Sequence, residues 1–146
     1  MTTRFDRDGL EKLRNEKRSR NFYRLETPRT VEHEFRGRFG HPSSYAYVRF
    51  ECAPRDDLSF EARVSWPPTA LGEGPKFERA IAESVADELL AGDFQHSGCA
   101  VTLVEVRYDE VGSSAVAFMR AAKAAMQDLL IGNWKIVFRP QKASPR

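Results

Sequence analysis

The sequence predicts an α+β domain with one mostly antiparallel sheet and two helices on one of its faces. Three observations carry this prediction. Several segments alternate apolar and polar residues with a period of two, two others repeat apolar residues at helical spacing, and glycine or proline separates most of these segments. In chain order the segments give β-β-β-α-β-α-β.

The first three strands have the clearest alternation. Apolar and charged residues alternate over 30–39, again over 45–52, and most regularly over 58–66. Pro54 closes the second segment, and Pro67 forbids further pairing after the third. Because each segment has one apolar and one polar side, we expect an antiparallel meander with one buried and one exposed face.

A helix and a strand of different character come next. Apolar residues recur at helical spacing over 77–89, and Gly92 follows them, which predicts a helix that packs on the sheet. The segment 99–108 has apolar residues on both faces. This pattern is typical of an interior strand with close neighbours on both sides.

The last two elements complete the order. Ser113 or Ser114 is a credible N-cap for a helix that extends to Leu130, and Gly132 is a credible stop signal. Alanines on its apolar side indicate close packing. Residues 135–138 form a short final strand before Pro140.

The two ends of the chain look different from the domain at 24–140. Residues 1–23 are rich in charge and poor in apolar residues, so we expect a flexible, partly helical arm, and 141–146 form a polar tail. The basic residues of the arm that are candidates for RNA contact are Lys12, Arg14, Lys17, Arg18 and Arg20. Such an arm either grips RNA or only keeps the protein in solution.

The composition is that of a globular protein in a reducing compartment. The chain has 146 residues, 41% of them hydrophobic and 30% charged, and its net charge of +2 does not by itself indicate a nucleic-acid binder. Cys52 and Cys99 are too few and too isolated for a disulfide framework, which favours the cytoplasm. No apolar segment is long enough to cross a bilayer, so we expect no membrane partner.

The sequence offers no recognisable catalytic arrangement. His33, His41 and His96 are not at metal-ligand spacing with each other or with a cysteine, so we expect no metal. The chain has no Gly-x-x-x-x-Gly-Lys loop for nucleotide phosphates and no Gly-x-Ser-x-Gly elbow. We therefore expect no cofactor, no bound nucleotide and no enzymatic activity.

Several local sequences resemble domain IV of translation elongation factor G, elongation factor 2 and their relatives, which has the ribosomal protein S5 domain 2-like fold. The most specific are 108–109 and 113–118, which look like the strand end and the serine pair before the second helix of that domain. Weaker support comes from 45–48, 31–34 and 138–140. The resemblance covers 23–139 and implies an unusual left-handed crossover from the third strand through the first helix.

In that family the domain reaches the ribosomal decoding region with two tip loops, and the resemblance places these loops at 40–44 and 109–112. The second loop is shorter than in the family and carries no histidine. The implied RNA-contact candidates are His41, Ser43, Ser44, Asp109 and Ser113. Ser113 and Asp109 are equally explained by capping and turn chemistry.

Aromatic and basic residues also share one face of the second strand. Tyr45, Tyr47 and Arg49 lie at alternate positions, and such side chains stack on bases and pair with phosphates. A solvated sheet face, on which glutamates balance the arginines, explains the pattern as well.

Two functions remain in competition. The first is a non-catalytic, translation-factor-like module that binds the ribosome, rRNA or tRNA without a GTPase of its own. The second is a protein-protein interaction module that kept the fold and lost ribosome binding.

Overall fold

The computed structural model describes residues 3–14, 21–37, 44–92 and 94–138, and the following applies to them. The elements are β1 (Thr3–Phe5), α1 (Arg7–Arg14), β2 (Asn21–Leu25), β3 (Arg29–Arg36), β4 (Tyr45–Pro54), β5 (Ser59–Ala62), the 3-10 turn η1 (Pro68–Ala70), α2 (Gly74–Leu89), β6 (Gln95–Arg107), α3 (Ala115–Leu130) and β7 (Trp134–Phe138). From β3 onward their order is the expected one.

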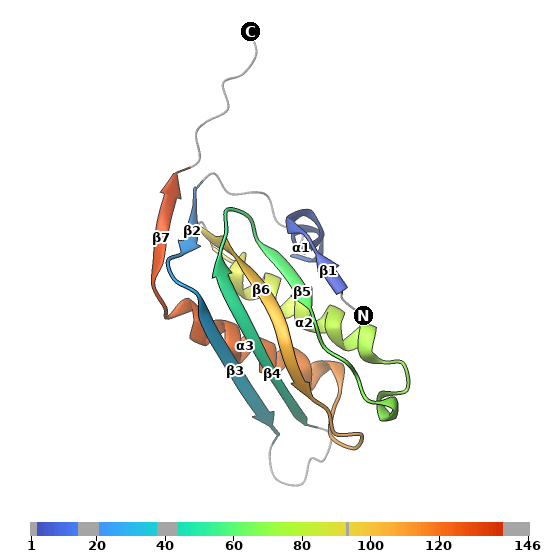
Figure 1. Cartoon of the computed structure of the whole chain (residues 1–146). Helices are drawn as coiled ribbons and strands as arrows, with labels where there is room; N and C mark the ends of the chain where they lie inside the picture. Colours follow the sequence, from blue (N-terminus) through green and yellow to red (C-terminus); the bar gives the residue numbers. More distant parts are fainter. Residues whose placement is uncertain (1–2, 15–20, 38–43, 93, 139–146) are drawn as a thin grey trace.

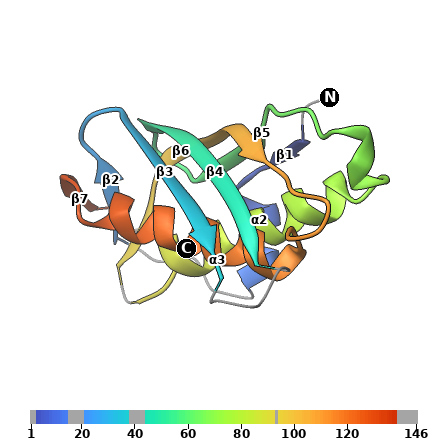
Figure 2. The same cartoon turned by 90° about the horizontal axis from the view of Figure 1, so that it is seen from below.

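The strands form one mixed sheet, and α2 and α3 cover one of its faces (Figures 1 and 2). Four of the strand pairs are antiparallel, whereas β2 and β5 each run parallel to β6. The fold is therefore α+β with a mixed sheet. The other face of the sheet carries no helix over β3, β4 and β6 (Figure 2).

The longest strand, β6, lies between β4 and β5 and corrects the expected meander. β4 pairs with β3 and β6, whereas β5 pairs with β6 and β1. The prediction that β6 is an interior strand is confirmed. Gly98 allows β2 to approach β6, because a Cβ there would lie 2.5 Å from the Arg24 Cα atom.

The connection from β5 through α2 to β6 has an uncommon hand. Both strands run downward in Figure 1, with β5 to the right of β6 and α2 behind the sheet. This arrangement is a left-handed crossover, whereas nearly all parallel crossovers are right-handed.

The core lies between the sheet and the two long helices. Phe50 and Phe60 from the strands pack with Ile81 of α2 and Phe118 of α3, and all four are fully buried. Alanines on α3 let it approach α2 closely, and the Ser84 hydroxyl of α2 donates to the Met119 carbonyl of α3 at 2.7 Å.

The N-terminal segment differs from the expected flexible arm. Residues 3–14 form β1 and α1, β1 pairs with β5, and α1 packs on α2. Leu10 is fully buried in the main core, and the Phe5 ring lies 6.0 Å from the Phe60 ring. A few well-placed apolar residues thus anchor a segment whose composition is mostly charged.

The expected boundary at residue 24 falls inside β2, which also pairs with β6 and β7. Lys17, Arg18, Arg20 and the tail at 141–146 lie outside the described residues.

Candidate functional site

At one end of the sheet, the second expected tip loop meets the start of β4, which follows the first expected tip loop in the sequence. The Tyr45 amide at the start of β4 donates to the Gly112 carbonyl at 2.8 Å, and the Ser113 hydroxyl donates to the Tyr45 carbonyl at 2.9 Å. These two bonds join β4 to the segment between β6 and α3. We call 109–113, together with Ser44 and Tyr45, the loop end.

The base of the first loop is narrow. The Gly37 amide donates to the Ser44 carbonyl at 2.6 Å, and a Cβ on Gly37 would lie 2.0 Å from the Ser44 Cβ. Only glycine fits such a close approach. His41 and Ser43, the other candidates on this loop, lie outside the described residues.

The second loop is closed by its own polar groups. The Ser113 hydroxyl accepts from the Asp109 amide at 2.9 Å, and an Asp109 carboxylate oxygen accepts from the Val111 amide at 3.0 Å. Ser114 is the N-cap of α3, because its hydroxyl accepts from the Ala117 amide at 3.1 Å. The two serines therefore have different tasks: Ser113 holds the loop to β4, and Ser114 begins the helix.

A third loop, which precedes α2, lies beside the loop end (Figure 1). The Tyr108 hydroxyl donates to the Thr69 carbonyl at 3.4 Å, which connects the end of β6 to η1. Leu71 follows η1 in the left-handed region, with a φ of 53°, and its side chain is 86% exposed. This conformation is costly for leucine, and the side chain gains no burial in return.

Tyr45, the first of the predicted tyrosines, takes part in a polar network on the face of β3 and β4 that carries no helix. The Tyr45 hydroxyl donates to Glu34 at 3.0 Å, Arg36 donates to the same carboxylate at 3.0 Å, and the guanidinium carbon of Arg36 lies 5.2 Å from the centre of the Tyr45 ring. The bonds from Tyr45 and Arg36 lower the pKa of Glu34.

The second tyrosine, Tyr47, is more deeply placed. Its hydroxyl donates to Glu32, and the guanidinium carbon of Arg107 lies 4.2 Å from the centre of its ring. Burial, together with the bond to Glu32, raises the pKa of Tyr47 to about 12. The phenol is therefore neutral throughout the physiological range.

Arg49, the third predicted residue of this face, pairs with Glu105 at 3.2 Å, and Glu105 also accepts from Arg107 at 3.3 Å. Three arginines and three glutamates thus lie on this part of the face. Arg36 pairs with Glu34, Arg49 and Arg107 both pair with Glu105, and Glu32 accepts from Tyr47. The face therefore carries aromatic-guanidinium pairs together with acids that balance the arginines. Arg107 and Glu105 were missed, since only the pairing of β4 with β6 brings them to Tyr47.

The basic residues of the N-terminal segment lie apart from the loop end. Lys12 is exposed on α1, which Figure 1 places toward the other end of the sheet. Arg14 is the last residue of α1. Within the described ranges, therefore, these residues do not join the tyrosines in one surface.

Other chemistry is sparse in the described part of the chain. No group of three or more His, Cys, Asp or Glu side chains there could hold a metal ion. Cys52 and Cys99 are buried, and burial raises the pKa of both thiols, that of Cys52 to about 12. No helix among the described residues is long and apolar enough to cross a membrane.

Comparison with known proteins identifies a similar fold. No family model and no curated protein matches the sequence. The crystal structure of ttk003000868 from Thermus thermophilus is similar, with a TM-score of 0.64 and 22% identity over 82% of this chain. This chain spans only 18% of the length of that protein. At this identity the similarity shows the fold: the α+β architecture described above also occurs within a much longer protein.

Proposed function

We propose that this protein is a non-catalytic, translation-factor-like module that binds the ribosome or structured RNA through its loop end. It has the ribosomal protein S5 domain 2-like topology of elongation factor G domain IV and works in the cytoplasm without a GTPase of its own. The element order from β3 to β7 and the left-handed β5-α2-β6 crossover support this topology.

The observation that carries the proposal is the junction between the start of β4 and the second expected tip loop. Residues far apart in the sequence are held together by the bonds between Tyr45, Gly112 and Ser113. The pairs Arg36–Tyr45 and Arg107–Tyr47 lie on the adjoining sheet face. Guanidinium groups over aromatic rings can contact phosphates while the junction contacts the RNA backbone.

Ribosome co-sedimentation at increasing salt tests the proposal. Removal of one phosphate contact by Arg107→Gln is expected to weaken association and to reduce the slope of log K against log salt by about 1. Arg79→Gln is the matched control, because Arg79 pairs with Glu83 at the same 3.3 Å distance that joins Arg107 to Glu105. Absence of association at low salt, or equal losses in both variants, refutes the proposal.

The charge balance on the sheet face favours a second candidate, a protein-protein interaction module. A surface on which each arginine meets a glutamate attracts phosphates weakly. Val111 of the loop end, 64% exposed, and Leu71 beside it, 86% exposed, also present apolar side chains. A nuclease-resistant protein partner that is lost in Leu71→Asp, with no rRNA recovered, would favour this candidate over the first.

A further inference from the structure

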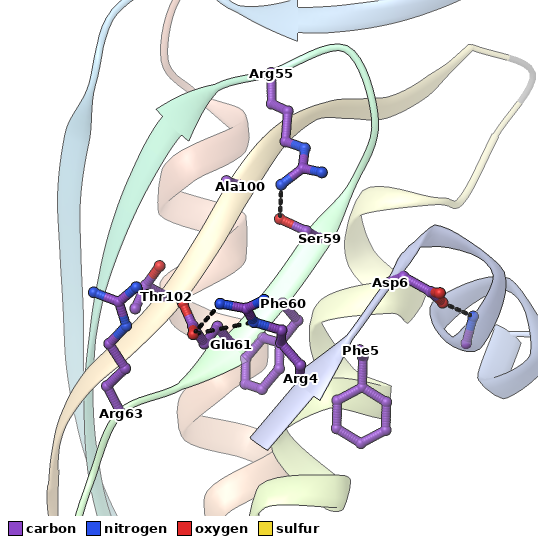
Figure 3. A pocket seen from close by; sticks show the side chains of 11 residues that line it. Arg4, Phe5, Asp6, Arg55, Ser59, Phe60, Glu61, Arg63, Ala100 and Thr102 are labelled. Atoms are coloured by element: carbon purple, nitrogen blue, oxygen red, sulfur yellow. Dashed lines mark hydrogen bonds and ion pairs between the residues drawn. The ribbon is translucent and has the colours of Figure 1, made fainter. Parts of the chain in front are cut away.

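A separate hollow lies on the sheet between the N-terminal segment and β5 and β6 (Figure 3). Its volume is about 680 Å³, within the range of small-ligand sites. Arg4 and Asp6 line it from the N-terminal segment, Ser59 and Glu61 from β5, and Thr102 from β6. Arg55, from the turn before β5, lines the top of the hollow in Figure 3, and Arg4 lies below it.

The Glu61 carboxylate pairs with two of the arginines. Arg4 donates to one Glu61 oxygen at 3.1 and 3.3 Å, and Arg63 pairs with the other oxygen at 2.8 Å. The bonds from Arg63 and Arg4 lower the pKa of Glu61, so this group stays ionised and keeps both guanidinium groups beside the hollow. Each guanidinium has five N–H donors and uses only some of them on Glu61.

The third arginine, Arg55, has a different kind of partner from the other two. Arg55 donates to the Ser59 hydroxyl at 3.3 Å, and among the described residues no carboxylate lies within ion-pair distance of it. The remaining acid, Asp6, accepts from the Gly9 amide at 2.8 Å in the first turn of α1. Three arginines thus face two carboxylates, and the hollow has a formal charge of +1.

We propose that this hollow binds a phosphate-bearing ligand. A phosphate group offers several acceptor oxygens, so it can accept from Arg55 and from the unused N–H groups of Arg4 or Arg63 at once. The Ser59 and Thr102 hydroxyls supply further donors without added charge. The volume leaves room for the group that carries the phosphate, either a small organic molecule or a nucleotide of an RNA chain.

This site is independent of the proposed ribosomal function. It depends on Arg4 and Asp6, which precede the segment that resembles domain IV, and it contains no residue of the loop end. Loss of ribosome association would leave phosphate binding intact. Loss of phosphate binding would likewise leave ribosome association intact.

Backbone amide and arginine side-chain NMR on the full chain tests the proposal. Three probes are titrated separately: inorganic phosphate, a short oligoribonucleotide with a 5′-phosphate, and the same oligomer without it. We expect shifts confined to the residues of the hollow, and affinity lowered about tenfold or more by Arg55→Gln, since a charge-assisted hydrogen bond to the phosphate is lost. Arg79→Gln, on the helix-covered side, is expected to leave affinity unchanged.

The probes separate the sources of the phosphate. Shifts with inorganic phosphate indicate a small-molecule ligand, and shifts only with the phosphorylated oligomer indicate an RNA end. Equal shifts with both oligomers indicate internal phosphodiesters. Scattered shifts with every probe, or equal affinities of wild type and Arg55→Gln, overturn the proposal. Arg55 is exposed, so its replacement leaves the fold intact.

Discussion

Replacement of Leu10 by alanine tests whether the N-terminal segment is part of the folded domain. The Leu10 side chain is 0% exposed and belongs to the main core. Burial of a leucine contributes about 1.5–3 kcal/mol, and the cavity left behind adds to the loss. Because α1 is a short surface helix that can settle into part of this cavity, we expect a loss of about 2–3 kcal/mol, the lower part of the range for Leu→Ala.

Urea unfolding followed by circular dichroism measures this difference as a lower midpoint at unchanged slope. Lys12→Ala is the control, because Lys12 lies on the same helix with an exposed side chain, and its effect should remain within about 0.5 kcal/mol. If Leu10→Ala is no more destabilising than Lys12→Ala, α1 is not anchored in the core, and the packing argument fails.

Three further outcomes are expected. Ser114→Ala removes the N-cap of α3 and should lower stability by about 1 kcal/mol in thermal unfolding; no loss would mean that the cap is not formed. Leu71→Asn relieves the strain of the left-handed backbone at this position and removes no buried side chain, so the melting temperature should stay constant or rise. A lower melting temperature would mean that the Leu71 side chain makes stabilising contacts. Tyr47 has a raised pKa of about 12, so the native state binds more protons than the unfolded state between pH 10 and 12. Stability should therefore fall across this window, and Tyr47→Phe should flatten the fall; an unchanged profile would contradict the assignment.

Alternation and helical spacing predicted the type and order of the elements from β3 onward because those patterns are local, but β5 ends at Ala62 and not at the expected residue 66. The pairing of β5 was missed because alternation reports which face of a strand is buried, not which strand lies beside it. β2 was missed because only two of its residues, Phe22 and Leu25, are buried. Likewise, Leu10 and Phe5 were too few to stand out among the charges of the first 23 residues.

The candidate site was predictable to the extent that it follows strand order. Tyr45, Tyr47 and Arg49 share a face because the period of a strand is two, and the structure places them so. Their partners Arg107 and Glu105 depend on the register between β4 and β6, which no local pattern encodes. The hollow between the N-terminal segment and β5 and β6 depends on long-range packing in the same way.

The central place of β6 has a consequence for the order in which a growing chain can fold. Among the described strands, β2 pairs with β6 and β7 alone, and β4 and β5 each keep one edge open until β6 is available. On a translating ribosome the early strands would therefore emerge with unpaired edges, which are prone to association with other chains. A chain that stops before Gln95 lacks β6, so its β3-β4 hairpin and its β1-β5 pair would have no central strand to join them.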